Sequence, residues 1–308
     1  MLQTKIKIMK RFFSLLAIIA LTLSNAPAQD KPDFKRTEDV IYSRKFGSAL
    51  TLDVFTPTKP NGIGILWMVS GGFFSSHEAI NPNAYRPLLE RGYTIFAVVH
   101  GSQPKYTISE IEVDVHRAVR FVRHNAAKYG VDPKRLGITG SSAGGHLCLT
   151  IGTQGCDGDS KAKDPINQES SAVQCVACFY PPTDFMNWSK EGDDGVGFGP
   201  TIRHQAAFGP RSYNAESRQA LGKEISPIYF VTKSMPPTLV IHGDSDHEVP
   251  IYQAKMFEKR CQEVGAPYKL TIKPGKDHGW PGMEADVRVL ADWFDEHLRD
   301  IKPKATAQ

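Results

Sequence analysis

Apolar runs that fit buried strands alternate with helical patterns along most of the chain. A continuous apolar run at residues 63–69 is typical of a strand covered on both faces. The other predicted strands of the central sheet are residues 93–99, 135–139, 173–180, 238–241 and 268–272. Helical spacing of apolar residues marks segments 82–90, 109–129, 143–151, 252–264 and 283–298. Residues 49–55 alternate between apolar and polar, as an edge strand at an antiparallel start would. The order of these elements predicts an α/β fold with a mainly parallel central sheet and helices on both faces.

Residues 109–129 form the clearest predicted helix. Apolar residues from Ile111 to Val122 recur on one face of it. Ser109 is the expected N-cap, and Gly130 is expected to end the helix.

Two polar segments interrupt the alternation. Residues 154–172 and 184–222 are rich in Gly, Asp, Asn and Ser. We expect loops there, or a small cap on the carboxyl end of the sheet, with the cap-like insertion at about 184–222. Neither a repeat nor a long linker divides the sequence, which predicts a single domain over residues 29–308.

The first 28 residues have the layout of a secretory signal peptide. Lys5 to Arg11 supply a basic start, residues 12–23 form an apolar run, and Ala26–Ala28 gives an Ala-x-Ala cleavage motif. The apolar run is too short to span a bilayer comfortably. We therefore expect cleavage after Ala28 and an exported protein, periplasmic or secreted, with no stable membrane association afterwards.

The net charge also belongs to this segment. The chain has 37 basic and 33 acidic residues, a formal charge of +4. Four of the basic residues lie in residues 1–28, where no acidic residue occurs, so the remaining chain has 33 of each sign. A neutral body excludes nucleic acid as the main partner, because such binding depends on a basic face.

The cysteines predict neither a disulfide scaffold nor a metal site. The five are Cys148, Cys156, Cys175, Cys178 and Cys261. This number is too small for a disulfide-rich domain; the pairing stays open, and an odd count leaves at least one free thiol. Cys175 and Cys178 have a metal-like spacing, but residues three apart on a strand point to opposite faces. We expect core residues there and no metal, because no second Cys/His pair lies at zinc spacing.

The motif Gly-x-Ser-x-Gly at residues 140–144 is the candidate nucleophile turn, with Ser142 at its centre. A short apolar strand precedes it and a helical pattern follows, which is the context that a nucleophile elbow requires. The glycines remove Cβ clashes from a tight turn, and the helix N-terminus favours a developing oxyanion. Ser142 is therefore the predicted nucleophile.

A serine hydroxyl needs a base, and chain position favours His278. It follows the strand predicted at 268–272, and the carboxyl ends of strands carry the chemistry of α/β sheets. The chain order Ser, acid, His places the acid after the strand at 238–241, where it would orient His278. Three carboxylates lie within reach of that turn: Asp244, Asp246 and Glu248. Position favours Asp246, but the residues alone leave the choice open.

Two backbone N–H groups are needed to hold the oxyanion. One is expected from Ala143, directly after the nucleophile. The other is expected from the loop after the strand at 63–69, where paired glycines let N–H groups approach without side-chain interference. The candidates in that loop are Gly71, Gly72 and Phe73.

Three segments together resemble the α/β-hydrolase superfamily, and within it the esterase/lipase branch that includes bacterial acetylxylan and feruloyl esterases. The segments are residues 129–147, residues 236–250 and His278-Gly279. The resemblance implies that Asp246 is the acid, because this branch places it three residues before a Val. The branch commonly has His-Gly-Gly at the oxyanion loop. This chain has Ser70 at the first position, which implies different anchoring bonds for the loop.

The resemblance implies a serine esterase that cleaves carboxylic esters through an acyl-enzyme, with no metal or organic cofactor. Its expected partner is a small-molecule or carbohydrate-linked ester, with acetyl and feruloyl esters of plant polysaccharides as candidates. Seven loop residues are candidate substrate contacts, and they are Phe74, Trp188 and Trp280, with Phe73, Phe198, His204 and Phe208 in addition. The alternatives are a prolyl-oligopeptidase-type peptidase, an amidase of the kynurenine formamidase type, and a non-catalytic binding member. The complete set of Ser, Asp and His argues against the last.

Overall fold

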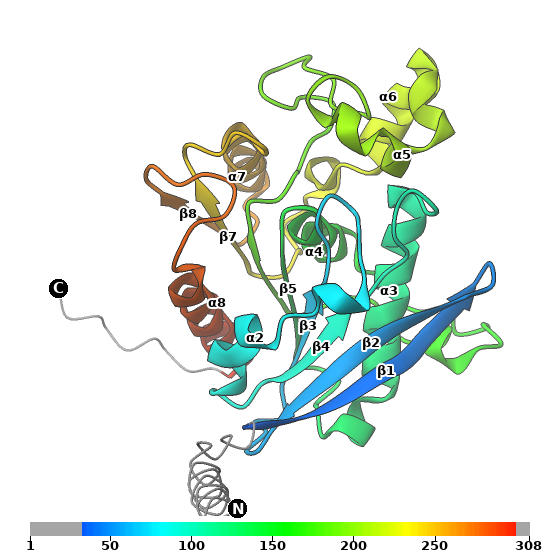
Figure 1. The fold of residues 1–308 in the computed structure, drawn as a ribbon, viewed down its shortest axis with the longest axis vertical. Coiled ribbons are helices and arrows are strands. Elements are labelled where there is room, and N and C mark those ends of the chain that lie inside the picture. Colours follow the sequence, from blue (N-terminus) through cyan, green and yellow to red (C-terminus); the bar gives the residue numbers. More distant parts are fainter. Residues whose placement is uncertain (1–32, 300–308) are drawn as a thin grey trace, which may run out of the picture. The chain divides into compact units, whose positions relative to one another are not determined.

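Eight strands form one sheet in residues 33–299, the part of the chain that the computed structural model describes (Figure 1). They are β1 (Phe34–Lys45), β2 (Ser48–Pro57), β3 (Gly64–Met68), β4 (Thr94–Val98), β5 (Leu136–Ser141), β6 (Cys175–Phe179), β7 (Thr238–Gly243) and β8 (Tyr268–Lys273). Their order in space is β1-β2-β4-β3-β5-β6-β7-β8. β2 pairs antiparallel with both β1 and β4, and the other neighbouring pairs are parallel. The prediction of a mainly parallel sheet is confirmed.

The sequence pattern misses the edge strand β1, and the edge position expected for residues 49–55 is wrong. β2, which contains those residues, lies between β1 and β4. Six of the twelve residues of β1 are charged, a composition that protects an exposed edge from pairing with another chain. The register against β2 shifts twice, between Thr37 and Val40 and between Ile41 and Ser43. These shifts break the alternation by which a strand is recognised in sequence.

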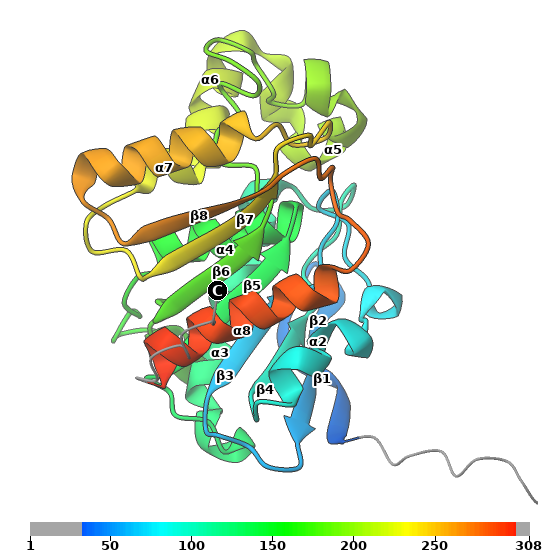
Figure 2. The same cartoon turned by 90° about the vertical axis from the view of Figure 1, so that its left-hand side faces the viewer.

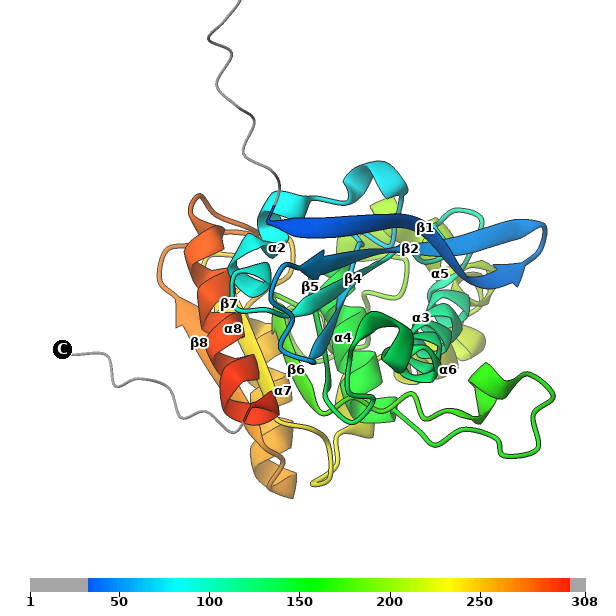
Figure 3. The ribbon, with the colours of Figure 1, turned by 90° about the horizontal axis from the view of Figure 1, so that it is seen from below.

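Helices cover both faces of the sheet, as predicted (Figures 2 and 3). On one face, α2 (Pro82–Leu89) and α8 (Met283–Leu298) pack against each other and against the strands. On the other face lie α3 (Ile108–His124), α4 (Ala143–Gln154) and α7 (Tyr252–Val264).

Each face of the sheet has its own cluster of buried apolar side chains. One cluster contains Phe257 of α7, and the other contains Phe294 of α8. Cys178 belongs to the first and Cys175 to the second, which confirms that these two side chains point to opposite faces. All five cysteines are free thiols, and of these only Cys156 is exposed.

Helix α3 begins earlier than predicted and ends in a separate turn. Thr107, not Ser109, is the N-cap, because Glu110 accepts from the N–H of Thr107 at 2.8 Å and completes a capping box. A 3-10 turn, η2 (Ala126–Tyr129), follows α3. Gly130 closes that turn with φ 64°, so it ends the helical backbone as expected.

The residues between β6 and β7 form short helices at the carboxyl end of the sheet, seen at the top of Figure 1. They are η4 (Gly199–His204), α5 (Gln205–Phe208), η5 (Pro210–Tyr213), α6 (Ala215–Glu224) and η6 (Pro227–Phe230). The sequence pattern does not predict α6, because the segment is polar and lacks an apolar face. The helix is nevertheless capped by Asn214, which accepts from the N–H groups of Glu216 and Ser217. Two further 3-10 turns are η1 (His77–Ala79) and η3 (Pro165–Gln168).

The predicted signal peptide, residues 1–28, lies outside the described residues, so export stays a prediction. Within residues 33–299, none of the helices combines the length and the apolar character that a bilayer crossing needs.

Candidate active site

Ser142 lies at a sharp turn between β5 and α4. Its backbone has φ 55° and ψ −124°, values that a non-glycine residue rarely adopts. Glycine is needed on either side. A Cβ on Gly140 would lie 2.8 Å from the carbonyl carbon of Gly144, and a Cβ on Gly144 would lie 2.9 Å from the carbonyl oxygen of Met68. The strand–turn–helix conformation predicted from the glycine pattern is therefore present.

Three side chains from separate loops meet at this turn. Oγ of Ser142 lies 2.9 Å from Nε2 of His278, and Nδ1 of the same ring lies 2.8 Å from Oδ2 of Asp246. His278 lies between β8 and α8, and Asp246 follows β7. The carboxylate thus holds the imidazole with Nε2 facing the hydroxyl, the arrangement in which a ring can accept a proton from serine.

Asp246 faces donors on both carboxylate oxygens. Oδ1 accepts from the N–H groups of Glu248 and Val249 at 2.9 and 2.8 Å. Oδ2 lies 3.3 Å from Nε2 of His242, in addition to its bond with His278. Burial by itself would raise the pKa of Asp246, but the bonds from His242, His278 and Val249 outweigh it and hold this pKa well below its usual range. Asp246 therefore stays ionised beside His278.

The two neighbouring acids have other partners. Asp244 accepts a hydrogen bond from the N–H of Gly275 at 2.6 Å, and Glu248 forms an ion pair with Arg203. The geometry therefore separates Asp246 from the two carboxylates that chain position leaves as rivals.

The glycine loop after β3 brings two of the three predicted residues, Gly72 and Phe73, to the cavity beside Ser142. Gly71 and Phe74 exchange backbone hydrogen bonds at 3.0 and 2.9 Å. The N–H of Gly71 is thus occupied, and its prediction as an oxyanion donor is corrected.

Within residues 33–299, the N–H groups of Gly72 and Phe73 have no acceptor, and both residues line the same cavity as Ser142. Ala143 also lines it, and as the first residue of α4 it has an N–H without an intrahelical acceptor.

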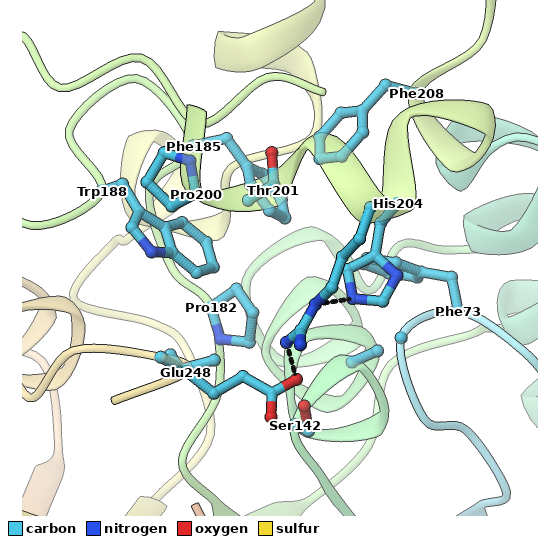
Figure 4. A pocket seen from close by; sticks show the side chains of 14 residues that line it. Phe73, Ser142, Pro182, Phe185, Trp188, Pro200, Thr201, His204, Phe208 and Glu248 are labelled. Atoms are coloured by element: carbon cyan, nitrogen blue, oxygen red, sulfur yellow. Dashed lines mark hydrogen bonds and ion pairs between the residues drawn. The ribbon is translucent and has the colours of Figure 1, made fainter. Parts of the chain in front are cut away.

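A narrow cavity opens beside Ser142 (Figure 4). Its apolar wall comes from the oxyanion loop, the segment after β6 and the cap: Phe73, Pro182, Phe185, Trp188, Pro200 and Phe208. Of the predicted substrate contacts, Trp188, Phe73 and Phe208 lie in this wall, and His204 also lines the cavity. Sequence reasoning misses Pro182 and Phe185, although the proline pair that ends β6 indicates that the chain leaves the sheet there.

The predicted contacts Phe74, Phe198 and Trp280 do not line this cavity. Phe74 is 51% exposed. Trp280 is buried against Phe179 and Tyr180 and donates its indole N–H to Asp286 at 2.7 Å. Position in a loop does not reveal which side of that loop a side chain occupies, so these expectations are corrected.

Charged side chains border the outer side of the cavity. Arg203 of η4 forms an ion pair with Glu248 of the acid loop, and its Nε lies 3.0 Å from Nε2 of His204 (Figure 4). The same pair also lines open surface clefts whose other walls include His247 and Asp277. The Arg203–Glu248 pair therefore stands between an apolar interior and a polar exterior.

One group of metal-ligand types lies outside this site. Oxygens of Asp39 and Asp53 and a ring nitrogen of His77 lie within 4.8 Å of one another. The guanidinium of Arg36 lies 2.6 Å from Oδ2 of Asp53, and its positive charge opposes a cation at the same place. We therefore assign no metal to this group.

The sequence of this chain matches a known protein family and several named esterases. A family model described as BD-FAE matches residues 52–261. Esterase LipQ of Mycobacterium tuberculosis is 30% identical over 253 residues, which are 80% of this chain and 57% of that protein. The chain therefore spans little more than half of the length of such relatives.

Two solved structures are similar over most of this chain. A truncated carbohydrate esterase from gut microbiota has a TM-score of 0.73 at 26% identity, and the match covers 89% of this chain and 100% of that one. A bifunctional GH43-CE protein of Bacteroides eggerthii has a TM-score of 0.70 at 27% identity, over 87% of this chain and 39% of that one.

Proposed function

This chain belongs to the BD-FAE family, and from that membership and the geometry around Ser142 we propose that it is a carboxylic-ester hydrolase. The observation that carries the proposal is the line of hydrogen bonds from Ser142 through His278 to Asp246, at 2.9 and 2.8 Å. A binding protein does not need these three groups in line, whereas acyl transfer uses each of them. The names esterase and carbohydrate esterase, carried by proteins 30% and 26% identical, support the same reaction class.

In the proposed reaction, Ser142 is the nucleophile and His278 the general base. Oγ of Ser142 bonds to the ester carbonyl carbon while Nε2 of His278 takes the hydroxyl proton. The ionised Asp246 stabilises the imidazolium that results. Because all three groups are already within hydrogen-bond distance, little reorganisation precedes the attack.

The carbonyl oxygen becomes an oxyanion in this step and needs donors. We assign this role to the N–H of Ala143 together with the N–H groups of Gly72 and Phe73. Backbone donors fixed in place before the reaction stabilise the developing charge without reorganising.

Collapse of the intermediate completes the first half-reaction. The carbon–oxygen bond to the alcohol breaks, and His278 returns its proton to the leaving oxygen. Water then enters, gives a proton to His278 and bonds to the acyl carbon. The bond between that carbon and Oγ of Ser142 breaks, and His278 returns the proton to Oγ, which releases the acid and restores Ser142. No step requires an oxidant, a reductant or a metal.

The two sides of the site support a short acyl group and a polar alcohol as the halves of the substrate. Aromatic rings of Phe73, Phe185 and Phe208 line the narrow cavity beside Ser142, which favours an acetyl group over a bulky feruloyl group. The outer clefts are lined by charged and polar side chains, which suit the hydroxyls of a sugar. We therefore propose acetylated carbohydrates as the first substrates to test.

Ser142→Ala tests the reaction class. The parent should hydrolyse p-nitrophenyl acetate and take up a fluorophosphonate on Ser142, located by mass spectrometry of the labelled peptide. The variant should do neither, while its circular dichroism spectrum stays that of the parent. A variant that hydrolyses the ester at the rate of the parent would sink the proposal.

A substrate panel separates the remaining classes. Acetylated xylan and methyl ferulate test the two acyl groups, N-formylkynurenine tests the formamidase alternative, and a prolyl p-nitroanilide tests the peptidase alternative. We expect the highest kcat/KM on the acetyl ester. If the parent is labelled by fluorophosphonate but has its highest kcat/KM on the anilide, Ser142 is the nucleophile of a peptidase and not of an esterase.

A further inference from the structure

Gln103 is a buried polar residue that no sequence motif points to. It lies between β4 and α3 and is 4% exposed. Its side-chain Nε2 donates a hydrogen bond to the carbonyl oxygen of Gly72, and its backbone N–H donates to the carbonyl oxygen of Phe73 at 3.1 Å. Gln103 therefore binds the oxyanion loop at two successive carbonyl groups.

The direction of the Phe73 N–H follows from the first of these bonds. The carbonyl of Gly72 and the N–H of Phe73 belong to one planar trans peptide, in which the two groups point in opposite directions. Holding the oxygen on Gln103 therefore turns the N–H of Phe73 away from Gln103, and this N–H has no acceptor within residues 33–299. A flip of this peptide would replace the donor by a carbonyl oxygen, which repels an oxyanion.

The loop needs such a hold because its backbone is unusual. Gly72 and Phe73 have φ values of 54° and 64°. Positive φ values are sterically unfavourable for Phe73, which has a Cβ atom. The preceding hydroxyl offers no support, because Oγ of Ser70 is buried without a hydrogen-bond partner in the described part of the chain. The neighbouring peptide is held differently: the carbonyl of Gly71 accepts from the N–H of Phe74 at 2.9 Å, and no side chain is involved.

We infer that Gln103 is a positioning residue for the oxyanion hole, which fixes the peptide between Gly72 and Phe73 so that the N–H of Phe73 is a donor. This inference rests on the proposed function and deepens it, because it names the side chain that prepares the hole. The side chain at position 103 must donate a hydrogen bond to the carbonyl oxygen of Gly72. An acceptor in place of Nε2 would repel that oxygen and destabilise the oxyanion hole.

The surroundings of this amide determine the design of the test. His204 of the cap faces it, with Nδ1 at 3.4 Å from Nε2 of Gln103, and Arg203 contacts the other ring nitrogen. Burial and the charge of Arg203 lower the pKa of His204. A carboxylate at position 103 would face the His204 ring directly, so the pH dependence of Gln103→Glu is compared with that of Gln103→Glu/His204→Asn, which lacks the imidazole.

Gln103→Met keeps the approximate length of the side chain and removes the donor. We expect kcat for p-nitrophenyl acetate to fall by about tenfold to a hundredfold, less than the complete loss of a donor costs, with KM within about threefold of the parent. Gln174→Met is the matched control, because the Gln174 side chain bonds the N–H of Leu136, at the end of the sheet away from Ser142. It should keep the kcat of the parent.

Gln103→Glu gives a readout that a merely structural role would not move. A protonated carboxyl can donate to the carbonyl of Gly72, whereas an ionised one repels it. The kcat of this variant relative to the parent should therefore rise at least about threefold from pH 8 to pH 5. If Gln103→Met does not fold, the pH dependence of the kcat ratio between Gln103→Glu and the parent tests the inference by itself.

Two outcomes have different meanings. An active parent with a folded Gln103→Met variant of unchanged kcat, or a Gln103→Glu ratio that is flat with pH, would overturn the inference and leave the esterase proposal standing. A parent that neither hydrolyses the ester nor takes up the fluorophosphonate would overturn the proposed function itself.

Discussion

The acid loop and the edge of the cap face each other across one cavity, yet they are held in different ways. In the acid loop the side chain of Asp246 is fully buried, one of its oxygens accepts from two backbone N–H groups, and the other bonds Nδ1 of His278. At the cap edge, one ion pair joins Arg203 of η4 to Glu248 of the acid loop, and these side chains are 57% and 39% exposed. A buried, fully hydrogen-bonded charge is oriented before the reaction, whereas an exposed pair is screened by water and contributes ~0–1 kcal/mol. We therefore expect reactivity to depend on the acid loop and selectivity to depend on the cap.

The largest effect is expected from Asp246→Asn. An amide in place of the carboxylate no longer holds the His278 tautomer in which Nε2 accepts the proton of Ser142, so kcat should fall by about 10³- to 10⁴-fold with little change in KM. Steady-state kinetics with p-nitrophenyl acetate measure this loss. Asp244→Asn is the matched control two residues away. Since Asp244 bonds the N–H of Gly275, that variant should remain near the parent, and similar losses in both variants would contradict the assignment of the acid.

The second effect concerns the apolar wall contributed by the cap. Phe208 is buried and packs edge-on against Phe185, with ring centroids 5.1 Å apart. Phe208→Ala removes part of the wall, so kcat/KM for p-nitrophenyl hexanoate relative to acetate should rise by about tenfold. The free energy of unfolding should fall by about 3–5 kcal/mol, measured by urea denaturation. Phe198→Ala is the control, because Phe198 stacks with Arg218 and does not line the cavity. A chain-length profile that matches the parent would show that the cap wall does not select the acyl group.

The same contrast explains how far the sequence predicts this site. Ser142 can be identified because its neighbours in sequence are also its neighbours in space: a strand, two glycines and a helix. His278 follows from the rule that loops at the carboxyl ends of parallel strands converge. The choice of Asp246 over Asp244 needed a family resemblance, because both lie in one turn and only their hydrogen bonds separate them.

Long-range contacts are the part that the sequence does not predict. Gln103 is 31 residues from Gly72 in the chain and belongs to no motif. Trp280 and Phe74 are aromatic loop residues like Trp188, but only the folded loops determine that Trp188 alone of the three faces the cavity. The edge strand β1 is missed for a related reason. Its charged residues and its irregular alternation are explained by its pairing with β2, which the sequence of β1 alone does not reveal.

A smaller effect links the acid loop to acid stability. The pKa of Asp246 is lowered in the folded chain, so the unfolded chain binds the proton more readily. The stabilisation is therefore complete above the usual pKa of this side chain, 3.8, and is lost as the pH falls below it. Urea denaturation of the parent and of Asp246→Asn from pH 7 to pH 3 should give a difference in unfolding free energy that shrinks toward pH 3. A difference that stays constant would contradict the lowered pKa.

The smallest effect is expected at the cap edge itself. Arg203→Ala and Glu248→Ala each break the ion pair that separates the apolar cavity from the outer clefts. Because both side chains are largely exposed, their coupling in a double-mutant cycle of unfolding free energies should be below about 1 kcal/mol, and it should decrease further in 1 M salt. Activity on p-nitrophenyl acetate should change by less than about fivefold in each variant, since neither side chain bonds the carboxylate of Asp246. A coupling several times larger would mean that the pair holds the cap closed over Ser142, and the division between a rigid acid loop and an adjustable cap edge would then be wrong.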